Sequence, residues 1–123
     1  MAGGEKNQDG NGGRSMTGYV LVVVTCGSAD EAAAIARAVV DQRLAACASV
    51  SGPVQSTFRW QGERQDATEY PLVLKTQAAR FPELEAAIRR LHSYETPEIL
   101  AVPVAAGSAA YLRWIDACVS PET

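Results

Sequence analysis

The sequence predicts an α+β fold of the ferredoxin-like, split βαβ type (βαββαβ), with an antiparallel sheet and an added C-terminal helix. Strand-period and helix-period segments alternate in the order strand, helix, strand, strand, helix, strand, and a third helix-period segment follows. The length of 123 residues, of which 47% are hydrophobic, is that of one domain with a real core. We therefore expect two helices on one face of a four-stranded sheet.

The first strand and helix have the clearest signals. Tyr19–Thr25 is continuously apolar and β-branched, which favours a central strand buried on both faces. Ser28 and Glu31 then have the spacing of a capping box, so a helix begins there and runs to about Arg43.

The middle of the chain predicts a hairpin. Cys47–Trp60 has the pattern of a strand interrupted at Gly52-Pro53, where we expect a bend and a sheet edge. The polar residues 61–67 predict the hairpin loop, and Tyr70–Thr76 predicts the returning strand.

The last third predicts a helix, a strand and a final helix. Apolar residues recur at helical spacing from Phe81 to Leu91. The apolar run Ile99–Val104 predicts the last strand, and its Pro103 indicates a strand end or an edge. Ser108 is the expected N-cap of the third helix.

The chain outside these elements is short and polar. Residues 1–18 are rich in glycine and polar residues and lack the apolar segment of a signal peptide, so we expect a disordered N-terminal tail. The folded domain is predicted over residues 19–119, and residues 120–123 form a short C-terminal tail.

The elbow, which we define as residues 92–98, is the expected functional site. It joins the second helix to the last strand and contains the only histidine of the chain, His92. Tyr94, Glu95 and Glu98 add polar groups at the edge of the sheet. A cation at a helix C-terminus is favoured by the helix dipole, which is the plain structural reason for a histidine at this place.

The sheet has too many apolar residues for a chain of this size. Tyr19–Val24, Leu72–Leu74 and Ile99–Val102 are apolar at successive positions, so both faces of the sheet require cover. Two helices cover only one face, and the remaining cover must come from other subunits. Homo-oligomerisation is therefore expected from burial alone.

Composition excludes several classes of function. The net charge is −3 and the arginines are scattered, so nucleic-acid binding is not expected. No segment is long and apolar enough to suggest a membrane span. An odd number of cysteines, three, with no CxxC pair favours a reducing compartment, for which we take the cytoplasm. No nucleophile motif or phosphate-binding loop is present, so we do not expect an enzyme.

Five motifs together resemble the CutA family, the divalent-cation tolerance proteins, and they occur in the same order and spacing. They are Arg43-Leu-Ala-Ala-Cys47, Arg59-Trp60-Gln-Gly62, Leu74-Lys75-Thr76, His92-x-Tyr94-x-x-Pro97-Glu98-Ile99 and Tyr111-Leu-x-Trp114. The resemblance covers about Tyr19 to Val119. It departs from the family pattern at Ser93, Ser49 and Phe58, where Pro, Asn and Tyr are usual. It implies a ferredoxin-like homotrimer linked to copper and other divalent metals, without a known catalytic activity.

The resemblance also suggests two metal ligands, Cys26 and His92. Bacterial relatives described as copper-binding use a cysteine at the end of the first strand and two adjacent histidines at the elbow, but here Leu91 precedes His92. Sulfur with imidazole suits copper, although two ligands are too few for a closed site. We expect copper or another divalent cation to bind weakly. We also expect the two side chains to lie at opposite ends of the sheet, so that their contributions are independent.

Six residues are candidates for a cleft or a subunit interface. They are Trp60, Lys75, Tyr94, Glu95, Glu98 and Trp114. The tryptophans are expected in an interface or the core, and Lys75 is expected either to pair with the elbow carboxylates or to line a cleft between subunits. The predicted function is copper or divalent-metal tolerance by a non-catalytic trimer. The alternative is a trimeric signalling protein that senses a small molecule or an anion in clefts between subunits.

Overall fold

The computed structural model describes residues 17–120, and its elements follow the predicted order. These are β1 (Tyr19–Cys26), α1 (Ala29–Asp41), β2 (Cys47–Val50), β3 (Val54–Trp60), β4 (Glu63–Gln77), the short 3₁₀ helix η2 (Ala78–Arg80), α2 (Phe81–Leu91), β5 (Ile99–Pro103) and α3 (Ala109–Val119). Most of the two predicted tails lies outside the described residues. Within them, Thr17 donates a hydrogen bond to the carbonyl of Val104 (2.7 Å) and Ser120 is the C-cap of α3.

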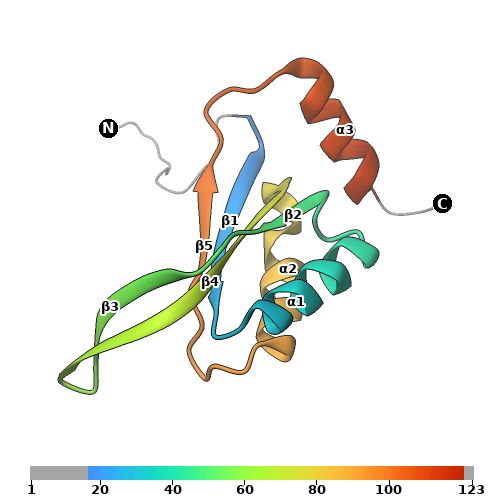
Figure 1. Cartoon of the computed structure of the whole chain (residues 1–123). Coiled ribbons are helices and arrows are strands. Elements are labelled where there is room, and N and C mark those ends of the chain that lie inside the picture. The colour runs from blue at the N-terminus through green and yellow to red at the C-terminus, as the bar shows by residue number, and fades with distance from the viewer. Residues whose placement is uncertain (1–16, 121–123) are drawn as a thin grey trace.

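The sheet is antiparallel throughout, with strand order β2-β4-β1-β5, and β3 pairs with the first half of β4. The main sheet therefore has the expected four strands, with β2 and β5 at its edges as the prolines beside them predicted. The β3–β4 hairpin, residues 54–69, extends beyond the sheet as a curved two-stranded ribbon, which we call the arm (Figure 1). The break at residues 51–53 separates β2 from β3 as predicted.

The tip of the arm differs from the loop predicted there. Residues 61–67 are not a loop, because β4 begins at Glu63 and only Gln61 and Gly62 form the turn. Both turn residues have positive φ, 50° and 82°, which is the backbone of the tight type I′ hairpin turn. The polar residues that follow belong to an exposed ribbon and not to a loop.

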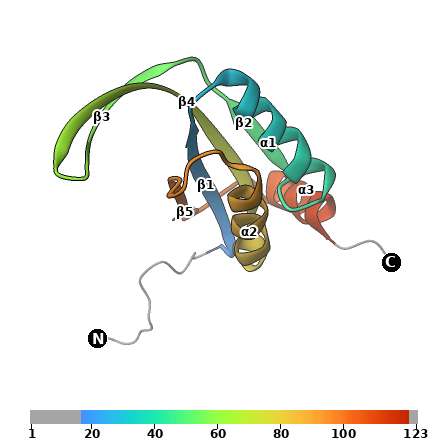
Figure 2. The same cartoon turned by 90° about the horizontal axis from the view of Figure 1, so that it is seen from below.

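The hydrophobic core lies between the sheet and helices α1 and α2, which cover the same face (Figure 2). Along β1, Val20, Val22, Val24 and Cys26 point into this core and are 0–3% exposed. The residues between them are only half-buried. The single chain therefore buries β1 on one face, and the predicted burial of its other face requires cover from other subunits.

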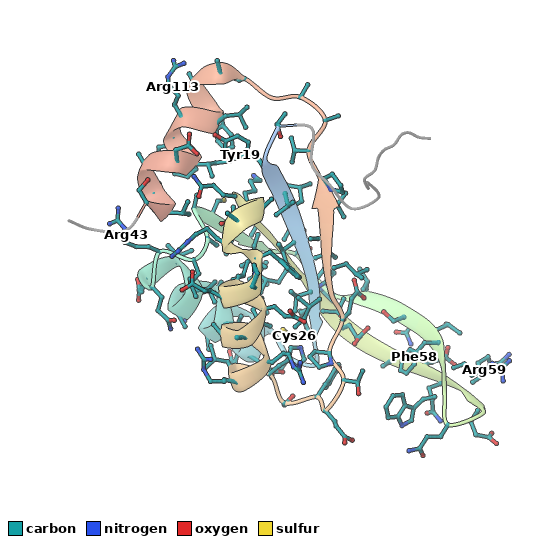
Figure 3. The ribbon with its side chains drawn as sticks, turned by 180° about the vertical axis from the view of Figure 1, so that it is seen from behind. Tyr19, Cys26, Arg43, Phe58, Arg59 and Arg113 are labelled. Carbon is teal, nitrogen blue, oxygen red and sulfur yellow. The ribbon has the colours of Figure 1, made fainter. Side chains whose placement is uncertain are left out.

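The opposite face, which we call the open face, has only partial cover. Leu100 and Val102 of β5 are 57% and 44% exposed, and Val102 pairs with Leu21 of β1. Helix α3 packs at the end of this face where β1 begins, with Tyr19 beneath it (Figure 3). Asp116 of α3 accepts hydrogen bonds there from the Tyr19 hydroxyl and the Gln77 amide, each at 2.7 Å.

The helix caps follow the sequence. The Ser28 hydroxyl accepts a hydrogen bond from the Glu31 amide (3.1 Å), and the Ser108 hydroxyl accepts one from the Tyr111 amide (3.4 Å). Both serines therefore satisfy an otherwise unpaired amide of a first helical turn. Within residues 17–120, no helix is long and apolar enough to cross a membrane.

Candidate functional site

The end of β1 and the elbow meet at one end of the sheet. Because β5 is antiparallel to β1, its first residue, Ile99, pairs with Val24 near the last residue of β1. Nε2 of His92 lies 2.8 Å from the carbonyl oxygen of Thr25, the neighbour of Cys26. The expectation that Cys26 and His92 lie at opposite ends of the sheet is therefore wrong. One chain brings the two predicted metal ligands into the same neighbourhood, where Figure 3 shows Cys26.

The imidazole of His92 is buried and both of its nitrogens have partners. Nδ1 accepts a hydrogen bond from the backbone amide of Tyr94 at 3.1 Å. The proton of the neutral ring therefore lies on Nε2, which donates to the Thr25 carbonyl. A metal ion would have to replace one of these two hydrogen bonds, which lowers the affinity of the site.

Glu31, which was predicted from the sequence only as part of a capping box, contacts the elbow. Its carboxylate accepts hydrogen bonds from the backbone amide and the hydroxyl of Ser93, at 2.6 and 3.1 Å. It also lies 3.8 Å from Nδ1 of His92. The side chain therefore connects the first turn of α1 to the elbow, and it does not complete the predicted capping box by returning to Ser28.

Cys26 is fully buried and its thiol is held in the protonated form. Burial raises the pKa of this thiol to about 11, with further contributions from the carboxylates of Glu31 and Glu69. A metal would have to displace the thiol proton, since the thiolate is the ligand. Among residues 17–120, no three His, Cys, Asp or Glu side chains gather closely enough to hold a metal. The described residues therefore do not form a closed metal site.

Tyr94 packs between the elbow and the end of β1. Its hydroxyl donates a hydrogen bond to Oε2 of Glu69 at 3.0 Å, and its ring centroid lies 4.7 Å from that of His92. Burial and then Glu69 raise the pKa of Tyr94 to about 12. A Cβ on Gly27 would lie 3.2 Å from the Tyr94 hydroxyl oxygen, so the absence of a side chain at Gly27 makes room for this ring.

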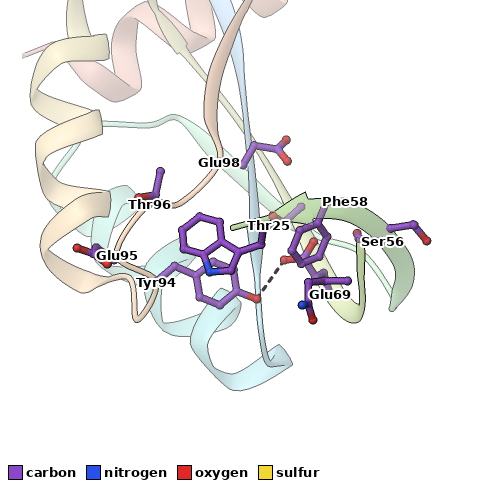
Figure 4. Close-up of a pocket in the computed structure, with 11 residues that line it drawn as sticks. Thr25, Ser56, Phe58, Glu69, Tyr94, Glu95, Thr96 and Glu98 are labelled. Carbon is purple, nitrogen blue, oxygen red and sulfur yellow. Dashed lines mark hydrogen bonds between the residues drawn. The ribbon is translucent and has the colours of Figure 1, made fainter. Parts of the chain in front are cut away.

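A cleft of about 710 Å³ separates the elbow from the arm, and we use "the cleft" for it below. Figure 4 shows Phe58 and Glu69 of the arm facing Tyr94 of the elbow. The lining residues are Thr25, Ser56, Thr57, Phe58, Trp60, Gln65, Glu69, Tyr94, Glu95, Thr96 and Glu98. Of this set, Trp60 and the elbow residues were predicted from the sequence as site candidates, whereas Phe58 and Glu69 were not.

The six predicted cleft or interface residues therefore separate into two groups. Trp60, Tyr94, Glu95 and Glu98 line the cleft. The other two, Lys75 and Trp114, lie near the contact between α3 and the sheet. Nζ of Lys75 is 5.7 Å from the ring centroid of Tyr111, which in turn lies 5.3 Å from that of Trp114.

Lys75 does not form the ion pair that was one of its two expected roles. It pairs with Leu21 in the β1–β4 register, well before the end of β1 at which the elbow lies. Within residues 17–120, the charged pairs are Arg80–Glu83 and His92–Glu31, so neither Glu95 nor Glu98 pairs with this lysine. Trp114 is 44% exposed and Trp60 is 46% exposed, so neither belongs to the core of the single chain.

The fold resembles those of known proteins. The solved structure described as the periplasmic divalent cation tolerance protein CutA from Archaeoglobus fulgidus superposes with a TM-score of 0.81 at 35% identity, covering 83% of this chain and 99% of that chain. The structure of the Thermus thermophilus divalent cation tolerance protein gives a TM-score of 0.78 at 40% identity, covering 79% and 94%. These neighbours confirm the predicted ferredoxin-like α+β class.

Sequence comparison gives the same family. Residues 20–118 match the family model described as CutA1 divalent ion tolerance protein. The divalent-cation tolerance protein CutA of Thermus thermophilus is 41% identical over 95 residues, 77% of this chain and 92% of that protein. Protein CutA of Homo sapiens is 38% identical over 106 residues, 82% of this chain and 59% of that protein. The chain belongs to the CutA1 divalent ion tolerance family, as the motifs predicted.

Proposed function

We propose that this chain is a divalent-cation tolerance protein that binds copper or another divalent cation weakly and without catalysis. The observation that carries the proposal is that Cys26 and His92 lie at the same end of the sheet, where the His92 ring contacts the carbonyl of Thr25, the residue preceding Cys26. The names of the curated relatives support the same role. Sulfur and nitrogen donors together suit copper better than calcium or magnesium.

Weak binding follows from what both donors already do in the fold. The thiol of Cys26 must lose a proton that the buried environment retains, and His92 must give up one of two hydrogen bonds. Both costs are subtracted from the metal–ligand energy. The protein would therefore respond to raised concentrations of the metal and would not hold it permanently.

We propose further that the working unit is a homotrimer in the cytoplasm. The half-exposed apolar side chains of the open face support assembly, because soluble monomers rarely leave such a face uncovered. The three cysteines are free in the chain, which agrees with a reducing compartment. The cleft supports the small-molecule alternative function, although its acidic lining does not favour an anion.

Competition between the protein and a chelator, for Cu(II) and separately for Cu(I) under anaerobic conditions, tests the metal proposal. We expect measurable but weak binding that is reduced by Cys26→Ser and by His92→Ala. Because the two residues lie at one end of the sheet, the double variant should lose less than the sum of the two single losses. Binding should strengthen as pH rises, since the thiol proton is then displaced at a lower cost.

Cys118→Ser is the matched control, because it removes a half-buried thiol from α3 and leaves the elbow intact. It should bind copper as the wild type does. A copper affinity that survives both Cys26→Ser and His92→Ala and is lost in Cys118→Ser would overturn the proposal. Melting curves of each variant separate loss of binding from loss of fold.

A further inference from the structure

We propose that the cleft between the arm and the elbow binds a small organic cation, with an ammonium group on an apolar body. This inference goes beyond the metal-binding proposal and concerns different residues. It rests on three observations about the cleft: the sign of its charges, the absence of ion-pair partners for its carboxylates among the described residues, and the aromatic rings among them.

The charged residues that line the cleft are all acidic. Glu69 comes from the arm, and Glu95 and Glu98 come from the elbow, whereas no Lys, Arg or His is among the lining residues. In the described part of the chain, none of these three carboxylates forms an ion pair. The site therefore holds a local excess of negative charge that the fold does not neutralise.

Glu69 shows the imbalance most clearly. It is 8% exposed, and the Tyr94 hydroxyl is the one hydrogen-bond donor to its carboxylate among the described residues. A buried carboxylate is costly unless a cation or several donors accompany it. The raised pKa of Tyr94, which Glu69 and Glu31 increase beyond the effect of burial, agrees with a negative field at this point. A bound cation would supply the missing charge.

Three aromatic side chains stand among these carboxylates. Phe58 and Trp60 lie on β3, with 41% and 46% of their surfaces exposed, and Tyr94 faces them from the elbow. The faces of aromatic rings attract cations, most strongly where water is excluded, and they also accept apolar groups. Rings combined with carboxylates therefore select a cation that carries hydrocarbon over a strongly hydrated inorganic ion.

The size and spacing of the groups argue against a bare metal in the cleft. Metal ligands must converge on one point, and within residues 17–120 no three acidic, histidine or cysteine side chains do so. In Figure 4, Glu98 extends toward the arm, whereas Glu95 lies on the other side of Tyr94. A volume of about 710 Å³ is instead within the range of sites for small organic molecules.

Three probes of nearly equal size and different charge test the proposal. They are phenethylammonium, the neutral 2-phenylethanol and the anionic phenylacetate, titrated into Trp114→Phe so that Trp60 is the only tryptophan. We expect saturable change of Trp60 fluorescence with the cation, at least tenfold weaker binding of the alcohol, and none of the anion. Calorimetry on the unmodified chain checks that the Trp114 substitution is neutral.

Charge variants identify the residues responsible. Glu98→Gln, at an exposed position, should weaken phenethylammonium binding several-fold without changing the melting temperature, and Phe58→Leu should weaken it as well. Asp41→Asn is the matched control, because it removes the same charge from an exposed site on α1 outside the cleft. The control should bind as the wild type does.

Several outcomes would overturn the proposal. Equal binding of all three probes would show an apolar cleft without charge selection, and equal losses in Glu98→Gln and Asp41→Asn would show only diffuse attraction. Failure of phenethylammonium to bind would overturn it as well. The copper experiment is separate, since Glu98→Gln should retain copper binding and Cys26→Ser should retain cation binding.

Discussion

The two faces of the sheet differ in how completely one chain covers them, although the same strands supply both. On the helix-covered face Leu74 and Val22 are fully buried, whereas on the open face Leu100 and Val102 are 57% and 44% exposed. The apolar content of the two faces is similar, but the chain provides helices along the whole length of one face only. The sequence therefore places more apolar surface on the sheet than a single chain can bury.

The largest effect should follow from a charge on the open face. In the proposed homotrimer, Val102→Asp would bury an unpaired carboxylate at each interface, at a cost of several kcal/mol per site. We expect light scattering to show dissociated chains. Val40→Asp makes the same change on α1, where the valine is 37% exposed, and should leave the assembly intact. A trimer that persists in Val102→Asp would show that this face is not the interface.

Two leucines allow the same truncation on each face. Leu74→Ala removes a fully buried side chain from the core and should cost about 2–5 kcal/mol at every protein concentration. Leu100→Ala should instead cost more as the protein is diluted, because its contacts are proposed to lie between subunits. Urea denaturation curves recorded at several protein concentrations distinguish the two variants. Equal, concentration-independent losses would contradict this account of the open face.

The smallest effect concerns α3, the only helix within residues 17–120 that packs on the open face. Hydrogen bonds from Gln77 and then Tyr19 lower the pKa of Asp116, so the folded state favours the charged form. The ionised carboxylate therefore contributes to the free energy of unfolding. This contribution is fully present above the pKa of an aspartate in the unfolded chain, about 3.9, and is lost as the pH falls through the lower pKa of the folded state. Asp116→Asn should therefore lower the melting temperature at neutral pH.

The pH dependence of this difference is the decisive measurement. The difference in melting temperature between the wild type and Asp116→Asn should become smaller below about pH 4, where the wild-type carboxylate also takes up a proton. Asp41→Asn, at an exposed site on α1, should show no such gap at neutral pH. A gap that stays constant down to the lowest pH would assign the effect to packing rather than to charge.

Local chemistry made most of the fold predictable from sequence. Hydrophobic periodicity identified every main helix and strand, and Ser28 and Ser108 marked two helix starts that the structure confirms. The arm was mispredicted at residues 61–67, because polar composition is shared by loops and by exposed ribbons. The positive φ of Gln61, which a tight turn requires, has no signal in the identity of that residue.

The candidate site was less predictable, because it depends on contacts between distant segments. Glu31 and Ser93 are 62 residues apart and hydrogen-bonded, yet the local signal of Glu31 indicated only a helix cap. The placement of Cys26 and His92 at the same end of the sheet follows from the antiparallel direction of β5, which was misjudged. Phe58 and Glu69 belong to the cleft only because the arm curves toward the elbow, and no periodicity records that curvature.

The missing side chain of Gly27 has a consequence for how this family can vary. Any larger residue at position 27 would meet the Tyr94 hydroxyl at a distance tighter than ordinary contact, and would push the ring away from Glu69. The two positions are therefore constrained to change together. A natural relative with a side chain at position 27 should therefore carry a residue smaller than tyrosine at position 94, and either substitution makes the other easier to accept.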